Sequence, residues 1–227
     1  MVKKILIFTK SYKNNGCCVA GMELYTGKWI RLVSSPSGDA IHWSNMYLNG
    51  VVIKEFDAVE VVVEPVPLKY QPENFLLKSF VKIIPKSDIE DFVKDIPIES
   101  PINIFGNKLP YVTEEVLMNP SKEIKTSLVL VEIQGLKVYE KVNKEGKKKK
   151  KASFYYNNIE HIDFSITDPF ICKLFDEKKD KELFIGDAYI VVSLPNAPYE
   201  TSDKYYKFIA KVLPEVIPEF WNNALSL

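Results

Sequence analysis

Short alternating runs of branched and aromatic residues, broken by turn residues and prolines, recur along the whole chain. The most apolar of these runs spans 51–66, and others lie at 5–11, 17–24, 29–34, 128–133 and 159–167. Branched and aromatic side chains suit the pleated, half-buried surface of a β-sheet, and alternation places every second residue on the same face. The 227 residues include 14 prolines, which restrict helix length. The sequence therefore predicts a mainly β fold with minor helical content.

The runs form two series, separated by a proline-rich segment. Eight prolines interrupt residues 65–120, so we expect irregular covering structure there and one short helix at 87–94, capped by Ser87. Each series holds about five strands, the number found in a five-stranded Greek-key barrel. We therefore expect two OB-like barrels packed together. The first would occupy 1–120 with its proline-rich cover, and the second would occupy 121–227.

The charge balance and the cysteine content indicate which binding partners and which cellular compartment to expect. The 30 basic and 30 acidic side chains cancel, so attraction to nucleic acid must come from local segregation of charge. The three cysteines (Cys17, Cys18 and Cys172) lack paired spacing, which favours reduced thiols in the cytoplasm. No apolar stretch approaches membrane-spanning length, and the run at 5–8 is too short for a signal peptide. We expect a soluble cytoplasmic protein with no membrane partner.

The strongest local charge lies at residues 141–151, KVNKEGKKKKK. Seven lysines and one glutamate give a formal charge of 7 − 1 = +6, and three aromatic residues follow at 154–156. Lysines can follow phosphates while aromatic rings stack on bases. The alternative is a solvated hairpin tip, and strand alternation requires neighbouring aromatic residues to face opposite ways. This pattern predicts nucleic-acid contacts by Lys147, Lys148, Lys149, Lys150, Lys151, Tyr155 and Tyr156.

A second group of basic, aromatic and amide side chains lies in the first series. Trp29 and Arg31 share one face of a strand, and Arg31 is the only arginine in the chain. Amides in the segment 67–74 can bond base edges or a small ligand. The alternatives are an arginine that ties the barrel to this segment, and amides that satisfy loop backbone groups. The predicted binding residues of this group are Lys10, Lys13, Trp29, Arg31, Gln71 and Asn74.

Residues suited to catalysis or metal binding form no recognisable pattern. His161 and Asp163 lie two apart on a strand, but no third ligand of the right type lies nearby. The glycines at 16, 21 and 27 do not form a phosphate-binding motif. We therefore expect no catalytic residues, no metal and no cofactor, and a binding module in place of an enzyme.

Several segments together resemble the dual OB-containing domain family of bacteria. In the family's order they are KSYKNNGCCVAG, GKWIRLVS, PLKYQPEN, ITDPF, YIVVSL and KYYKFIAKVL. Leu32 stands where the family often has proline, and 208–210 replace the family's Leu-Val-Ala run. The resemblance implies two OB-like barrels and a role in binding nucleic acid or nucleotides, partly in bacterial conflict systems.

Two functions follow from these patterns. The leading hypothesis is a non-enzymatic module that binds nucleic acid, single strands in preference, through barrel faces and the lysine-rich hairpin. The alternative is a sensor of a nucleotide or other small ligand, or a protein-interaction adaptor in a bacterial defence or conflict system. In that alternative, the proline-rich segment would enclose a pocket between the two halves.

Overall fold

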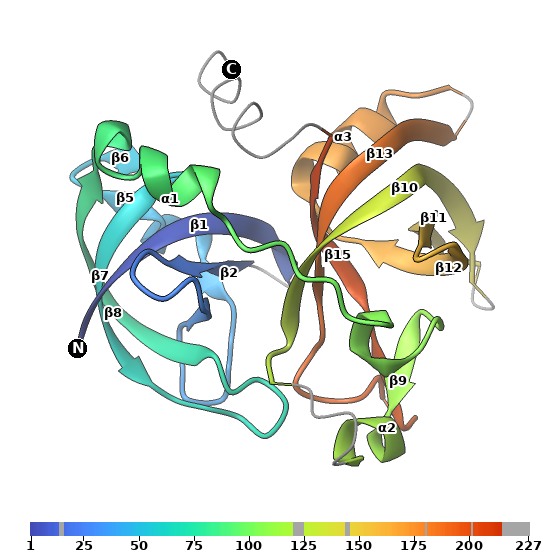
Figure 1. The fold of residues 1–227 in the computed structure, drawn as a ribbon, viewed down its shortest axis with the longest axis horizontal. Coiled ribbons are helices and arrows are strands. Elements are labelled where there is room, and N and C mark those ends of the chain that lie inside the picture. The colour runs from blue at the N-terminus through green and yellow to red at the C-terminus, as the bar shows by residue number, and fades with distance from the viewer. Residues whose placement is uncertain (14–15, 120–124, 144–145, 180, 201, 215–227) are drawn as a thin grey trace. The chain divides into compact units, whose positions relative to one another are not determined.

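The protein is described by a computed structural model covering residues 1–13, 16–119, 125–143, 146–179, 181–200 and 202–214 (Figure 1). Asn14 and Asn15 of the segment KSYKNNGCCVAG lie outside these residues. The chain divides into two compact units, whose described parts are residues 1–97 and 98–214. Each unit is built around a ring of five paired strands, so the expected mainly β fold is confirmed.

Five strands of the first unit pair in a closed ring. β1 pairs with β2 and β7, β8 pairs with β7 and β3, and the β2–β3 pairing completes the circle. All these pairings are antiparallel except that of β3 with β8. The ring strands are β1 (Val2–Lys13), β2 (Gly16–Glu23), β3 (Trp29–Val33), β7 (Ala58–Pro65) and β8 (Asn74–Ile84).

Short elements complete the first unit. β4 extends the sheet by pairing with β2, and β5 pairs with β6 in a separate two-stranded sheet. The connection between β3 and β7 contains β4 (Ile41–His42), the 3-10 helix η1 (Trp43–Asn45), β5 (Tyr47–Leu48) and β6 (Val51–Val52). After β8 come η2 (Lys86–Asp88) and α1 (Glu90–Lys94).

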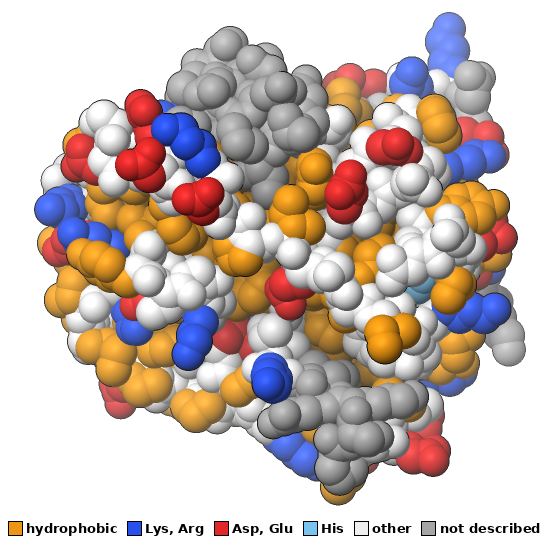
Figure 2. All heavy atoms as spheres, in the orientation of Figure 1, with side chains coloured by type: hydrophobic (Ala, Val, Ile, Leu, Met, Phe, Trp, Pro, Cys, Tyr) orange, Lys and Arg blue, Asp and Glu red, His pale blue; other side chains and the backbone are white. Residues whose placement is uncertain are grey.

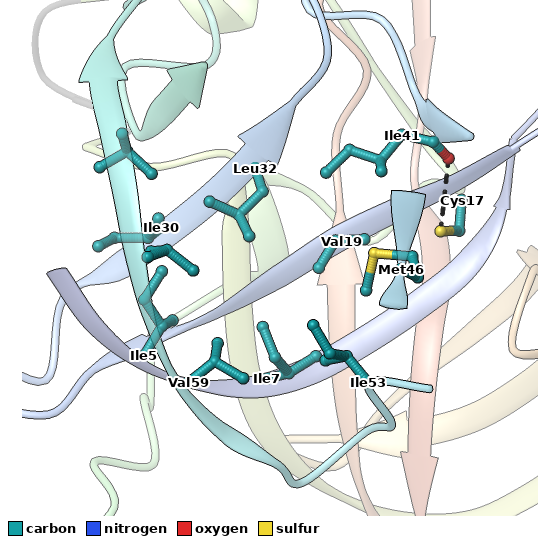
Figure 3. Packing of buried hydrophobic residues seen from close by; sticks show 12 residues of the cluster. Ile5, Ile7, Cys17, Val19, Ile30, Leu32, Ile41, Met46, Ile53 and Val59 are labelled. Atoms are coloured by element: carbon teal, nitrogen blue, oxygen red, sulfur yellow. Dashed lines mark hydrogen bonds between the residues drawn. The ribbon is translucent and has the colours of Figure 1, made fainter. Parts of the chain in front are cut away.

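The core of this unit is formed by alternate residues of its strands. Val59, Val61 and Val63 are each at most 1% exposed, as the predicted common face of β7 requires. Figure 3 shows how Ile5 and Ile7 of β1 converge with residues of β2 and β3 in the same cluster. Cys17 also belongs to this cluster, and burial raises the pKa of its thiol to about 11. The thiol is therefore protonated at neutral pH and serves as a core side chain.

The proline-rich segment differs from the prediction. The expectation of irregular structure throughout 65–120 is wrong, because β8 is an 11-residue strand within it. No proline occurs between Pro72 and Pro85, so this stretch can donate a full ladder of hydrogen bonds. Ser87 does not cap the short helix either. It lies inside η2, and α1 begins after Ile89 without a side-chain cap.

The second unit contains a closed barrel with the strand order β10-β11-β12-β15-β13. β12 and β15 are parallel, and the other neighbours are antiparallel. The barrel strands are β10 (Leu128–Val142), β11 (Lys148–Tyr156), β12 (Ile159–Ile166), β13 (Glu182–Ser193) and β15 (Phe208–Leu213). Further elements are η3 (Ile104–Gly106), β9 (Tyr111–Thr113), α2 (Glu114–Met118), α3 (Pro169–Asp176) and β14 (Lys204–Tyr206).

The two rings share one topology although no residue repeat is visible. In each, the first strand pairs with the second and fourth, and the third pairs in parallel with the fifth. This order belongs to the five-stranded Greek-key barrel that we expected for each half. Residues 66–73 connect the fourth and fifth strands of the first ring, and residues 194–207 make the corresponding connection in the second.

The segment 98–119 belongs to the second unit, so the division lies earlier in the chain than the expected boundary at 120. β9 pairs with β14, which lies between β13 and β15 of the second barrel. The Lys207 ammonium donates hydrogen bonds to the carbonyl oxygens of Ile104 and Asn107, both at 2.7 Å. These contacts attach the segment to the second barrel.

The helices of both units are short. The longest, α3, has eight residues and begins at Pro169, where the Asp168 carboxylate accepts from the N–H groups of Phe170 and Ile171. Among the residues that the structure describes, no helix has the length and apolar character needed to cross a membrane.

Candidate nucleic-acid interface

Trp29 and Arg31 lie in the interior, which corrects the expectation that they form an open recognition face. Trp29 is 7% exposed, and its ring packs edge-on against Phe8 with centroids 5.7 Å apart. Arg31 is 4% exposed, and its Nη2 lies 3.4 Å from Oε1 of Glu73. Of the two interpretations of Arg31, the contacts support the structural one, because Glu73 belongs to the segment 67–74.

The amide side chains of the same segment are also buried. Gln71 is 3% exposed and Asn74 is fully buried, and Nδ2 of Asn74 donates to Oε1 of Gln71 at 3.2 Å. Gly38 packs closely against both, since a Cβ at that position would lie 3.3 Å from Nδ2 of Asn74. These amides therefore cannot reach a base edge without local opening, and the hydrogen bond between them joins two side chains of the segment 67–74.

The ammonium groups of Lys10 and Lys13 both donate hydrogen bonds to backbone carbonyl oxygens. Lys10 is half-buried and donates to the Ile53 carbonyl oxygen, and burial lowers the pKa of its ammonium. Lys13 donates to the Gly38 carbonyl oxygen at 2.8 Å. The six residues predicted from the first series are therefore not brought together as a basic and aromatic surface.

The lysine-rich segment differs from the first group, because it leads into a part of β11 whose side chains alternate between the interior and solvent. Phe154 and Tyr156 point into the barrel and are 1% and 5% exposed, whereas Tyr155 is 47% exposed. The Tyr156 hydroxyl donates to the Pro101 carbonyl oxygen at 2.5 Å. Tyr155 is thus available to a ligand. Tyr156 is a core residue, which corrects its assignment as a binding residue.

The described lysines of the hairpin between β10 and β11 are largely exposed, and several form ion pairs across the barrel surface. We call residues 141–143 and 146–151 the lysine hairpin. Lys148 pairs with Glu140 and Lys150 pairs with Asp176, each at 2.8 Å. Exposed pairs of this kind contribute about 0–1 kcal/mol, so a phosphate can replace the carboxylate at little cost. Lys147 and Lys149 are exposed at the tip and at the start of β11.

An acidic residue also lies on this face. Asp163 accepts hydrogen bonds from the Tyr139 hydroxyl, at 2.8 Å, and from the Lys141 ammonium. Partial burial acts to raise the pKa of Asp163, but the two donors outweigh it and hold the pKa below its usual value. Asp163 therefore carries a negative charge at neutral pH and neutralises part of the lysine hairpin.

Lys151 connects the lysine hairpin to a second group of side chains. Its ammonium donates to the Ser165 hydroxyl at 2.8 Å and lies 5.9 Å from the centroid of the Tyr206 ring. Half-burial lowers the pKa of the Lys151 ammonium. Tyr206 belongs to β14, in the connection between the fourth and fifth strands of the barrel. Lys151 of the second strand thus contacts the connection between the fourth and fifth strands.

Sequence reasoning missed this second group, which we call the tyrosine cluster: Tyr111, Tyr199 and Tyr206. The centroid of Tyr206 lies 5.8 Å from that of Tyr111 and 5.9 Å from that of Tyr199, both in edge-to-face geometry. Lys204 places its ammonium 4.6 Å from the centroid of Tyr111. Burial alternates along 204–207, but the residue types there (KYYK) do not, and Tyr111 lies far earlier in the chain with no local signal that joins it to Tyr206.

His161 and Asp163, which lie two apart in the sequence, have different surroundings in the structure. No cluster of three or more His, Cys, Asp or Glu side chains suited to a metal occurs among the residues that the structure describes. His161 is fully buried and its ring stacks on Phe154 at 5.1 Å, so it faces the interior and is separated from Asp163. On the face shown in Figure 2, basic and acidic side chains are interspersed, in keeping with the balanced total charge.

Comparison with known proteins identifies one family. The model of the dual OB-containing domain matches residues 3–212, nearly the whole chain. Searches of curated proteins and of solved structures found no match. The matched range includes both rings of strands, and their shared topology agrees with the family's name. The chain belongs to the dual OB-containing domain family.

Proposed function

We propose that the second barrel binds single-stranded nucleic acid through the lysine hairpin and the outer face of β11. The observation that carries the proposal is the position of the lysines on the barrel. They surround the connection between the first and second strands: Lys141 lies near the end of β10, Lys147 in the connection, and 148–151 at the start of β11, from which Tyr155 also projects. In OB barrels, this connection, the one between the fourth and fifth strands, and the face of the second and third strands bind oligonucleotides.

Electrostatics supports a single strand that follows the hairpin and then crosses the barrel. Lys147, Lys148 and Lys149 are all exposed, and Lys148 and Lys149 project from opposite faces of β11, so together they offer cations to phosphates on both sides of the strand. Lys151 and Ser165 extend the polar surface toward the tyrosine cluster. Because net charge is zero over the chain, the attraction is local and will be strongly weakened by salt. The protein would act in the cytoplasm as a binding module without catalysis.

The test is fluorescence anisotropy with a labelled single strand of about 12 nucleotides, a length within the range covered by one OB barrel. We expect saturable binding at low salt and clear weakening when Lys147, Lys148 and Lys149 are replaced together by glutamine. A matched control replaces Lys173, Lys178 and Lys179, which are also exposed and lie on α3 and just after it. If both triple variants weaken binding equally, the loss of affinity comes from the change in net charge and not from the position of the lysines, and the proposal is contradicted.

A cavity in the first unit favours a second function, the binding of a small ligand such as a nucleotide. It has a volume of about 220 Å³ and is lined by apolar residues, including Ile84, Ile89 and Phe92, and by Lys4 and Lys82. Asp88 also lines the cavity, so its lining carries two cations and one carboxylate around an apolar surface, which suits a small planar ligand with both polar and apolar parts. Such a site would make the protein a sensor or adaptor in a bacterial defence or conflict system. A thermal-shift screen with nucleotides tests it, because a ligand that binds the folded state raises its stability.

A further inference from the structure

We infer that the tyrosine cluster is a stacking site for one unpaired nucleobase, with Lys204 and Lys151 placed to contact the phosphate next to that base. This inference rests on the proposed function. It adds that the second barrel contacts a base of the nucleic acid as well as its phosphates. Tyr111, Tyr199 and Tyr206 all lie outside the lysine hairpin.

Tyr199 presents an exposed aromatic ring on a fixed support. It is 55% exposed, although its ring already packs edge-to-face with Tyr206 at an interplanar angle of 89°. A perpendicular contact of this kind uses only part of the ring surface, so more than half of Tyr199 remains in contact with solvent. An exposed, supported ring can stack on any base.

Local hydrogen bonds hold the backbone that carries Tyr199. Its N–H donates to the Lys204 carbonyl oxygen at 2.9 Å, and its own carbonyl oxygen accepts from the N–H of Ser202 at 3.0 Å. The Ser202 hydroxyl donates to the same carbonyl at 2.6 Å. A ring held on a closed turn loses little conformational freedom when a base stacks on it, which favours binding.

Two ammonium groups lie at the cluster. That of Lys204 is 4.6 Å from the Tyr111 centroid, and that of Lys151 is 5.9 Å from the Tyr206 centroid. Both lysines are half-buried, so their charges are screened less than those at the hairpin tip. Rings that present a face, next to cations that can meet a phosphate, are the combination found where proteins bind single strands.

The inner face of the same strands explains why the cluster keeps its shape. β9 and β14 pair through three residues each, with Tyr111 opposite Tyr206. Val112 and Tyr205, on the other face, are fully buried and 4% exposed respectively. The ammonium of Lys207, also fully buried, donates to Oδ1 of Asn107 at 2.8 Å and so holds the chain that leads into β9. The outer tyrosines are therefore not needed to bury this small sheet.

The experiment compares a labelled single strand of about 12 nucleotides with an otherwise identical strand that carries abasic sites. Three proteins are measured: the wild type, Tyr199→Leu and Tyr12→Leu. Tyr12 is the matched control, since it is 56% exposed and its ring also packs edge-to-face on an aromatic neighbour, Trp43, with centroids 6.0 Å apart. Circular dichroism and thermal unfolding confirm that each variant is folded.

We expect Tyr199→Leu to weaken binding of the strand with bases by about 5- to 150-fold, the range for the removal of one stacked base. Affinity for the abasic strand should be unchanged, and Tyr12→Leu should affect neither strand. A second variant, Lys204→Gln, should weaken binding of both strands, since it removes a phosphate contact.

Three results would overturn the inference. If Tyr199→Leu changes neither affinity, or lowers both equally, the cluster does not stack a base. If the wild type binds both strands equally well, recognition is by charge alone, and the proposed function survives without this site. If neither strand binds at low salt, the proposed function fails together with the inference.

Discussion

The side chains of Arg31 and Glu73 form a buried ion pair that ties β3 to the start of β8. Nε and Nη2 of Arg31 both lie 3.4 Å from Oε1 of Glu73, and the two side chains are 4% and 5% exposed. The backbone adds to this link, because the N–H of Arg31 donates to the Glu73 carbonyl oxygen at 2.9 Å. The only arginine of the chain thus serves the fold of the first barrel.

This geometry predicts that Arg31→Met destabilises the protein without weakening nucleic-acid binding by the folded fraction. Removal of one partner of a buried ion pair costs about 3–5 kcal/mol, because the remaining buried charge loses the attraction of its counter-ion. Urea denaturation measures the decrease in unfolding free energy, and anisotropy measures affinity. The double variant Arg31→Met with Glu73→Leu should recover part of the stability. A large drop in affinity with unchanged stability would instead show that Arg31 contacts the nucleic acid.

The neighbours Tyr155 and Tyr156 should separate binding from stability. Tyr155→Ala removes a half-exposed ring and should weaken single-strand binding by about 1–3 kcal/mol, with little change in unfolding free energy. Tyr156→Phe removes the hydroxyl that donates to the Pro101 carbonyl, and should cost about 1 kcal/mol of stability while affinity is unchanged. The opposite pattern in the two variants would show that β11 is oriented the other way.

His161 should make the protein sensitive to mild acid. Burial, together with the charges of Lys207 and Lys108, lowers the pKa of His161 to about 4. Between the unfolded value of about 6.5 and pH 4, the unfolded state binds the extra proton, so the free energy of unfolding falls as pH falls. The full effect is on the order of 3 kcal/mol.

The variant His161→Phe tests this account, because phenylalanine keeps an aromatic ring beside Phe154 and cannot titrate. Unfolding free energies measured from pH 7 to pH 4 should decline less steeply in this variant than in the wild type. His42→Gln is the control, since His42 is exposed and is the only other histidine. Identical slopes in the wild type and His161→Phe would show that His161 is not the titrating group.

Much of the fold could be predicted from the sequence, because its strands carry strict local patterns. The apolar run at 51–66 contains β7, and the runs at 17–24 and 29–34 coincide closely with β2 and β3. The high proline content of the segment 65–120 argued against any long strand in it. The prolines nearest to β8, however, lie just before and just after that strand, so they do not interrupt it.

The site was harder to predict, because exposure is a tertiary property. Trp29 and Arg31 share a strand face, as the period of two requires, but both faces of β3 are buried. Alternation correctly required Tyr155 and Tyr156 to face opposite ways, yet it could not say which one faces solvent. The tyrosine cluster joins residues of β9 and β14 that are remote in the sequence, so only the paired strands reveal it.

The salt dependence of single-strand binding tests the central claim most directly. Anisotropy titrations over a series of salt concentrations give the slope of log affinity against log salt for the wild type and for the triple variant of Lys147, Lys148 and Lys149. If these lysines bind phosphates, the slope should become shallower by about 0.7 for each phosphate that is no longer neutralised, or about 2 in total. An unchanged slope, or no binding by the wild type even at low salt, would contradict the claim that the lysine hairpin binds nucleic acid.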